Sequence, residues 1–225
     1  MAVKTGGAIT VTSNTEPLGH LKLVSGASLM VSSGGVVRDI TNSGGTAIIA
    51  SGGSAIIDSG FTAEGITVIE RGDGGLRTTA GILKSCTIDS NGEIFASSAV
   101  IEDCVVSSGH LQLYGTAVVS NLSAYAGFVN LFTSGAMLVE DSFFGGTVTV
   151  AAKYDCHLLS NITVAGTVNL HIYNQGQAVD VSISGGNTSV YSGGALSNCQ
   201  IISSGTIKVF SGGIIENCSA GQGYI

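Results

Sequence analysis

Apolar and polar residues alternate in short runs along most of the chain. The runs follow a glycine, as in GHLQL (109–113), GFVNL (127–131) and GTIKV (205–209). Alternation with a period of 2 places the apolar side chains on one face of an extended segment, which predicts half-buried β-strands. The glycine before each run permits a tight turn that other residues resist. No stretch of useful length has the helical period, so we predict an all-β chain.

An Asn or Asp followed by a small or apolar residue recurs between these runs. In LSNC (196–199) and IENC (215–218) the asparagines stand at 198 and 217, a spacing of 217 − 198 = 19. Eight of the nine spacings in the resulting column lie between 18 and 20. We attribute the exception, 85 − 58 = 27, to a bulged loop at 71–75. The column consists of Asp39, Asp58, Ser85, Asp103, Asn121, Asp141, Asn161, Asp180, Asn198 and Asn217.

A repeat of this length cannot bury an apolar face alone, whereas stacked repeats bury one continuous core. We therefore predict a single domain over residues 1–225, a parallel β-helix or β-solenoid with roughly 11 coils of ~19 residues. The general preference for right-handed crossovers favours a right-handed helix. We expect residues 1–18 to form an N-terminal cap or the first coil, and residues 59–84 to form an irregular coil with a loop insertion.

The Asn/Asp column has a structural and a functional interpretation. Asn and Asp tolerate the left-handed backbone conformation in turns, and stacked Asn side chains hydrogen-bond in ladders. Alternatively, a row of carboxylates binds cations such as calcium. Asp and Asn alternate from Asp103 to Asn198, which relieves repulsion between like charges. We therefore favour a structural ladder and expect no metal.

Four of the five cysteines occupy the position directly after the column: Cys86, Cys104, Cys199 and Cys218. A free cysteine behaves as a small buried hydrophobe, so we expect an interior cysteine stack. Cys86/Cys104 and Cys199/Cys218 lie in adjacent coils, where a Cα separation near ~5 Å permits disulfides if the side chains face each other. The sequence leaves their oxidation state open. Cys156 is out of register.

Composition and charge exclude several function classes. The chain has a net charge of −7 and only 8 basic residues, without a cluster of them, which argues against nucleic-acid binding. No run of ~18 apolar residues is available to span a bilayer, and MAVKTGGAITVTSN contains no signal-peptide core. Charged residues are absent from 104–139, and the histidines are scattered. We expect no catalytic residues and no cofactor.

The segments SSGGVVRDITNSGGTAIIASGGSAIIDSG (32–60) and SVYSGGALSNCQIISSGTIKVFSGGIIENC (189–218) resemble AIDA-type repeats of bacterial autotransporter adhesins. The resemblance covers most of residues 19–220. It implies a right-handed β-helical passenger that is exported to the bacterial cell surface or secreted. It also implies adhesion to cells or to other bacteria. The chain departs from the family because we find neither an export signal nor a translocator barrel in it.

Two functions follow as hypotheses. The first is a non-catalytic adhesin-like module whose repetitive polar surface binds a host-cell or bacterial surface protein or glycan, with multivalency supplying avidity. The alternative is a self-assembling structural protein that forms filaments end to end, because uncapped solenoid ends expose unpaired strand edges. A lateral trimeric spike, with contacts through outward residues such as Ile48, Phe95 and Phe128, is a further arrangement.

Overall fold

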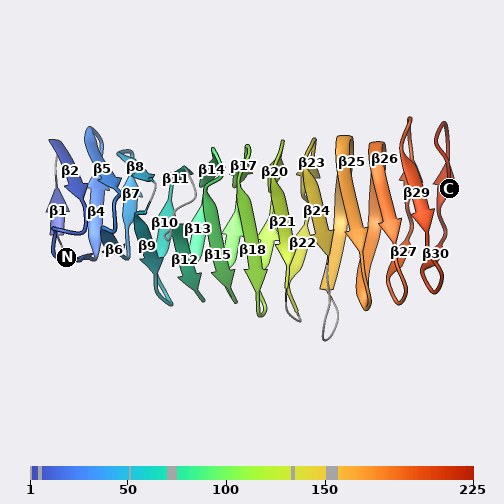
Figure 1. The fold of residues 1–225 in the computed structure, drawn as a ribbon, viewed down its shortest axis with the longest axis horizontal. Coiled ribbons are helices and arrows are strands. Elements are labelled where there is room, and N and C mark those ends of the chain that lie inside the picture. The colour runs from blue at the N-terminus through green and yellow to red at the C-terminus, as the bar shows by residue number, and fades with distance from the viewer. Residues whose placement is uncertain (1, 5–6, 51, 70–74, 133–134, 151–156) are drawn as a thin grey trace.

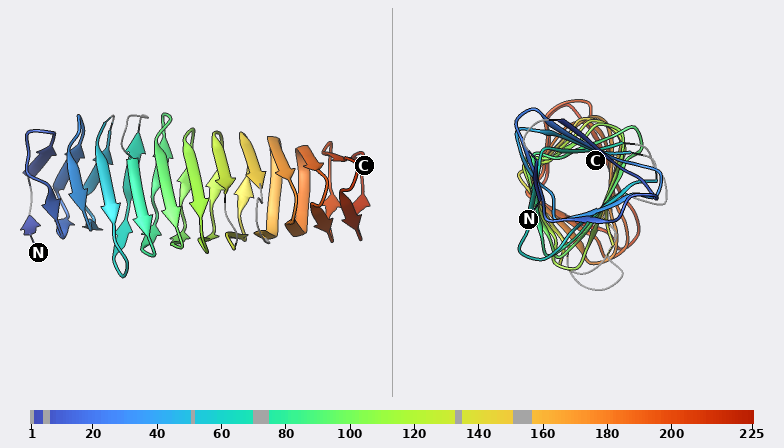
Figure 2. Two further views of the ribbon diagram at one scale, coloured as in Figure 1. Left: turned by 60° about the horizontal axis from the view of Figure 1, so that its bottom comes forward. Right: turned by 90° about the vertical axis from the view of Figure 1, so that its left-hand side faces the viewer.

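The protein is a long β-solenoid. The computed structural model describes residues 2–4, 7–50, 52–69, 75–132, 135–150 and 157–225, and these residues form thirty-one strands and no helix. Strands of successive turns pair in parallel; Leu111, for example, pairs with Val129 of the next turn. Figures 1 and 2 show a narrow prism with the two termini at opposite ends. The predicted all-β parallel solenoid is confirmed.

Each turn of the prism contributes a strand to each of three faces. Face A consists of β1 (Ala2–Lys4), β4 (Leu21–Val24), β7 (Thr41–Ser43), β10 (Thr62–Glu64), β13 (Ile82–Lys84), β16 (Val100–Glu102), β19 (Val118–Ser120), β22 (Met137–Val139), β27 (Ala195–Ser197) and β30 (Ile214–Glu216). Face B consists of β2 (Gly7–Val11), β5 (Ala27–Val31), β8 (Thr46–Ile49), β11 (Ile66–Ile69), β14 (Thr87–Asp89), β17 (Val105–Val106), β20 (Ser123–Ala124), β23 (Ser142–Phe143), β28 (Gln200–Ile201) and β31 (Ser219–Ala220). Face C consists of β3 (Leu18–Gly19), β6 (Val36–Arg38), β9 (Ser54–Ile57), β12 (Gly75–Thr79), β15 (Glu93–Ser97), β18 (His110–Tyr114), β21 (Phe128–Leu131), β24 (Thr147–Val150) and β29 (Thr206–Val209).

Two long strands run around all three faces. The first, middle and last parts of β25 (His157–Ile172) and β26 (Gly176–Val190) lie on faces A, B and C in turn. With these parts included, eleven strand segments follow one another on face C, which gives about ten complete turns.

The core is a single apolar cluster that runs through the described turns. On β18 the buried residues are Leu111 and Leu113, and Val129 and Leu131 stack on them from β21. Because strand side chains alternate between the two faces of a sheet, the residues between these point outward. The period-2 pattern of the sequence is therefore the inside–outside pattern of the prism.

The SGG motif has a steric explanation at its two glycines. Gly34 has φ +79°, in the left-handed region that favours glycine. The next residue, Gly35, follows so close to the preceding turn that a Cβ would collide with the carbonyl oxygen of Val11. The same two constraints recur at 52–53, 193–194 and 212–213.

The predicted loop insertion between Asp58 and Ser85 requires a correction. The interval from Asp39 to Asp58 holds three strands (β7, β8 and β9), whereas that from Asp58 to Ser85 holds four (β10, β11, β12 and β13). One extra strand moves the sequence motif by one face of the prism. Of the loop predicted at 71–75, residues 71–74 lie outside the described residues and Gly75 begins β12.

The single predicted column is consequently divided between two corners. His20, Asp39 and Asp58 follow the face C strands β3, β6 and β9, at the corner that leads to face A. From Ser85 onward the column follows face A strands, at the corner that leads to face B. Asp58 and Ser85 therefore do not stack, although the sequence places them at equivalent positions.

The side chain of Asn42 bridges a break in the face A sheet between β7 and β10. The strands β1, β4 and β7 form a sheet of their own, and β7 has no strand partner on the side of β10. The buried Asn42 side chain donates from Nδ2 to the carbonyl oxygens of Gly45 and Gly65 at 3.0 and 3.2 Å. Its Oδ1 accepts from the Gly45 N–H at 2.8 Å. The amide thus supplies bonds that a strand ladder provides elsewhere.

Candidate binding surface

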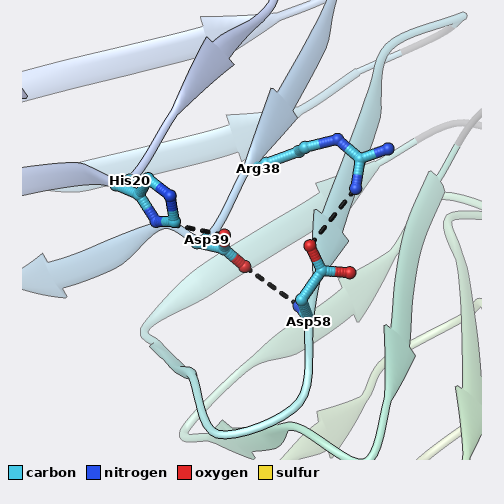
Figure 3. Close-up of polar contacts among 4 residues, drawn as sticks. All are labelled: His20, Arg38, Asp39 and Asp58. Atoms are coloured by element: carbon cyan, nitrogen blue, oxygen red, sulfur yellow. Dashed lines mark hydrogen bonds and ion pairs between the residues drawn. The ribbon is translucent and has the colours of Figure 1, made fainter. Parts of the chain in front are cut away.

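The first corner of the Asn/Asp column is a small polar cluster (Figure 3). Asp39 has φ 51° and is only 4% exposed, and its carboxylate lies 3.2 Å from His20 Nδ1. The other oxygen of Asp39 accepts from the Asp58 backbone N–H at 3.0 Å. Arg38 Nη1 lies 3.2 Å from the Asp58 carboxylate, and both side chains are about half exposed. These contacts join three successive turns at one corner.

The second corner carries the remainder of the column. Asp103, Asn121, Asn161, Asp180, Asn198 and Asn217 all have φ between 52° and 57°. Nδ2 of Asn121 donates to Asp103 Oδ1 at 3.2 Å, and Nδ2 of Asn217 donates to Asn198 Oδ1 at 3.4 Å. These are turn conformations and side-chain contacts between neighbouring turns, of the kind that the structural interpretation of the column describes. Within the described residues, no group of three or more His, Cys, Asp or Glu side chains is arranged to hold a metal ion.

Asp141 departs from its predicted place in the ladder. Glu140 has the left-handed backbone conformation (φ 61°), and Asp141 follows it at an inward position where other turns carry Cys104, Leu122 or Ile162. Asp141 is 1% exposed; its Oδ1 accepts from the Leu122 N–H at 2.7 Å, and its Oδ2 has no hydrogen-bond partner. Burial raises the pKa of this carboxyl to about 8, which its bonds to backbone N–H groups only partly oppose.

The four predicted interior cysteines lie at the inward position. Cys86, Cys104 and Cys199 are buried, and Cys218 is partly buried. Cys199 and Cys218 form a disulfide with a Cα separation of 4.5 Å, whereas Cys86 and Cys104 are free thiols. The Cys86 N–H donates to Cys104 Sγ at 3.3 Å. Cys156 lies outside the described residues.

The most varied side chains gather on the outward side of face C, in rows that run along the prism. The row at the start of the strands contains Glu93, His110, Phe128, Asn169, Asn187 and Thr206. The middle row contains Arg77, Phe95, Gln112, Asn130, His171, Ser189 and Lys208. The row at the end of the strands contains Tyr114, Phe132, Tyr173, Tyr191 and Phe210. No such mixture of aromatic and amide side chains follows the described part of face A.

The central turns of face C hold one amide in a fixed orientation. Gln112 Nε2 donates to Glu93 Oε1, and the Tyr114 hydroxyl donates to Gln112 Oε1 at 2.9 Å. Glu93 is 4% exposed, whereas Gln112 is half-buried and accessible. Burial, and to a lesser degree the charge of Glu93, raises the pKa of Tyr114, so its hydroxyl keeps its proton.

Two exposed phenylalanines lie beside this amide. Phe128 is 41% exposed and stacks on His110 with ring centroids 4.8 Å apart. Phe132 is 40% exposed and stacks on Tyr114 at 5.1 Å. Asn130 lies between them on the same strand line. We call Gln112, Asn130, Phe128 and Phe132 the amide–aromatic patch.

The row at the end of the strands continues on the last turns of face C. Tyr173, Tyr191 and Phe210 stack with centroids 4.6 Å apart and planes within 8° of parallel. The stacking leaves Tyr173 and Tyr191 half-buried, whereas Phe210 at the end of the stack is 45% exposed. The Tyr191 hydroxyl lies 3.4 Å from His171 Nδ1, and burial lowers the pKa of His171. The contacts of these side chains are therefore mostly with one another.

Sequence reasoning did not identify the amide–aromatic patch as a site. It predicted only that Phe128 points outward. A signal was nevertheless available, because an aromatic residue ends or directly follows the strand in LQLY, VNLF, IKVF and SVY. Aligning these runs by turn would have shown the rows.

Comparisons with known proteins do not show the family of this chain. No protein-family model and no curated protein matches the chain. The solved structures include a TibC-catalysed, hyper-glycosylated TibA55-350 fragment. It is 16% identical, and the match covers 99% of this chain and 96% of that chain with a TM-score of 0.34. At that score the match carries no conclusion about function, and the resemblance to AIDA-type repeats stays a prediction. No helix in the described residues is long and apolar enough to cross a membrane.

Proposed function

We propose that this chain is a non-catalytic, adhesin-like β-helical module that binds a surface protein or glycan of a host or bacterial cell through face C. The observation that supports it is the row structure of face C, in which exposed rings flank accessible amides at the strand repeat. Weak contacts repeated at that spacing give avidity when a partner engages several turns together.

A surface or secreted location is part of this proposal. The disulfide between Cys199 and Cys218 supports it, because disulfides persist in oxidising compartments and are rare in the cytosol. The low charge also suits a surface that adheres by polar and aromatic contacts rather than by electrostatic attraction to anionic polymers.

Beads coated with the purified protein test the proposal against cultured host cells and bacteria. We expect saturable attachment that soluble protein inhibits. A variant in which Phe128 and Phe132 are both alanine should attach less, and a variant with two outward face A residues changed, Val100→Ala and Val118→Ala, is the matched control. Equal attachment of coated and bare beads would contradict an adhesive role.

A self-assembling structural role is the second candidate. The strands β30 and β31 have a partner on one side only, and Ile214 is 52% exposed although the equivalent row on inner turns is largely half-buried. Unpaired edges are templates for another chain or for a further turn of the same chain. Sedimentation across a concentration series, with electron micrographs of the same fractions, distinguishes fibres from a stable monomer of 22.5 kDa.

A further inference from the structure

We propose that the amide–aromatic patch on β18 and β21 is a binding site for a neutral glycan. This inference rests on the proposed function and deepens it, because it names the ligand class and the residues. The ligand is a short run of uncharged hexopyranose units within a longer saccharide chain.

The patch combines the two kinds of group that a sugar ring requires. A pyranose presents apolar C–H groups on its faces and hydroxyl groups around its edge. Phe128 and Phe132 supply apolar surface, since each ring is about 40% exposed. The amides of Gln112 and Asn130 supply both donors and acceptors, which match hydroxyl groups that also do both.

The spacing of these groups suits a ligand of a few sugar units. Phe128 and Phe132 stand four positions apart on one strand line, so their backbones lie about 13 Å from each other across face C. Along the prism, Gln112 and Asn130 are register partners on neighbouring strands, which are roughly 4.8 Å apart. A saccharide lying over the amide row therefore meets one ring on either side.

The patch is also partly ordered before a ligand arrives. Gln112 is held between Glu93 and Tyr114, and the two rings are held by their stacking on His110 and Tyr114. Ordering free side chains on binding costs about 0.5–1.5 kcal/mol for each one, so a preformed patch loses less.

Charge decides between neutral and acidic saccharides. Residues 104–139 contain no Asp, Glu, Lys or Arg, so β18 and β21 offer no lysine or arginine to a uronate or a sulfate. The acidic group in the network, Glu93, is buried beside Gln112 on the neighbouring strand and disfavours an anion there. The complementary ligand is thus uncharged.

Affinity electrophoresis of the native protein tests the inference. The gels contain either a neutral polysaccharide (mannan, galactan or β-glucan) or an acidic one (alginate or heparin). We expect retardation by at least one neutral polysaccharide and none by the acidic ones. Gln112→Ala and Phe128→Ala should each weaken the apparent affinity by about tenfold, which corresponds to ~1.4 kcal/mol.

Phe144→Ala is the matched control. Phe144 is 43% exposed and stacks on Tyr125 at 5.2 Å, so it reproduces an exposed aromatic stack away from the amide row. We expect this variant to bind as the wild type does. Retardation only by acidic polysaccharides, retardation by none, or an equal loss in the Phe144 variant would each overturn the inference. Circular dichroism of every variant shows whether the fold is retained.

The bead assay separates this inference from the proposed function. If the Gln112→Ala/Phe128→Ala double variant attaches to cells as well as the wild type does, the adhesive role stands. The proposal that the amide–aromatic patch causes this adhesion is then wrong. If the wild type binds a neutral polysaccharide but no cell, the site stands and the adhesive role fails.

Discussion

Asp141 is a buried acid whose protonation should control the stability of the solenoid. Its pKa of about 8 lies far above the ordinary 3.8 because the carboxyl is desolvated among apolar neighbours. The folded chain therefore binds this proton more tightly than the unfolded chain does. Stability from this group is fully present below pH ~4, falls as the pH rises from ~4 to ~8, and is constant above that.

The magnitude follows from the separation of the two pKa values. Each pH unit between them lowers the free energy of unfolding by about 1.4 kcal/mol. At pH 7 the interval above 3.8 is about three units, so Asp141 lowers the free energy of unfolding by roughly 4 kcal/mol relative to a residue that does not titrate. That figure is a large part of the stability of an ordinary domain.

Asp141→Asn is the perturbation that isolates this effect. Asparagine retains an oxygen that accepts from the Leu122 N–H, but it does not ionise. We expect the variant and the wild type to unfold at similar urea concentrations near pH 4, and the variant to become more stable by a few kcal/mol at pH 8. Asp141→Leu, which copies the side chain at position 122 in the preceding turn, also does not ionise, so the free energy of unfolding should lose the same pH dependence. It should be less stable than Asp141→Asn at every pH, because it removes the acceptor of the Leu122 N–H.

Urea unfolding followed by circular dichroism, repeated between pH 4 and pH 9, supplies the assay. Asp103→Asn is the control, because Asp103 is exposed at the corner and an asparagine there keeps an oxygen that accepts from Asn121 Nδ2. If the stability difference between wild type and Asp141→Asn is the same at every pH, the carboxyl is not buried in the neutral form and the reasoning is refuted.

Three further predictions concern the backbone and the disulfide. Asn42→Ala removes three buried hydrogen bonds at the sheet interruption and should lower the free energy of unfolding by about 2–4 kcal/mol in urea titrations. Gly53→Ala should lower the thermal midpoint by several degrees because its Cβ meets a carbonyl oxygen, while Gly19→Ala, with open space around it, should not. Reduction of the Cys199–Cys218 disulfide should expose two additional titratable thiols and lower the free energy of unfolding by roughly 3 kcal/mol. An unchanged thiol count would contradict the bond.

The local pattern of the sequence was sufficient to predict the strands, the solenoid and most of the corners. Alternation in runs such as GHLQL depends only on which side chains prefer water, and this run became a strand with its leucines inside. The SGG motif is equally local. Its first glycine permits a positive φ, and its second leaves room for a carbonyl oxygen of the preceding turn, at 34–35, 52–53, 193–194 and 212–213.

The tertiary structure alone decided which positions stack. The extra strand between Asp58 and Ser85 is invisible to a count of residues, because the sequence motif continues while the prism has advanced by one face. Asp141 shows the same limit at a single residue: Glu140 takes the corner, and the acid beside it turns into the core. Neighbours on adjacent turns are separated by a whole turn of the chain, so only the register of the ladder shows which rings, amides and thiols meet.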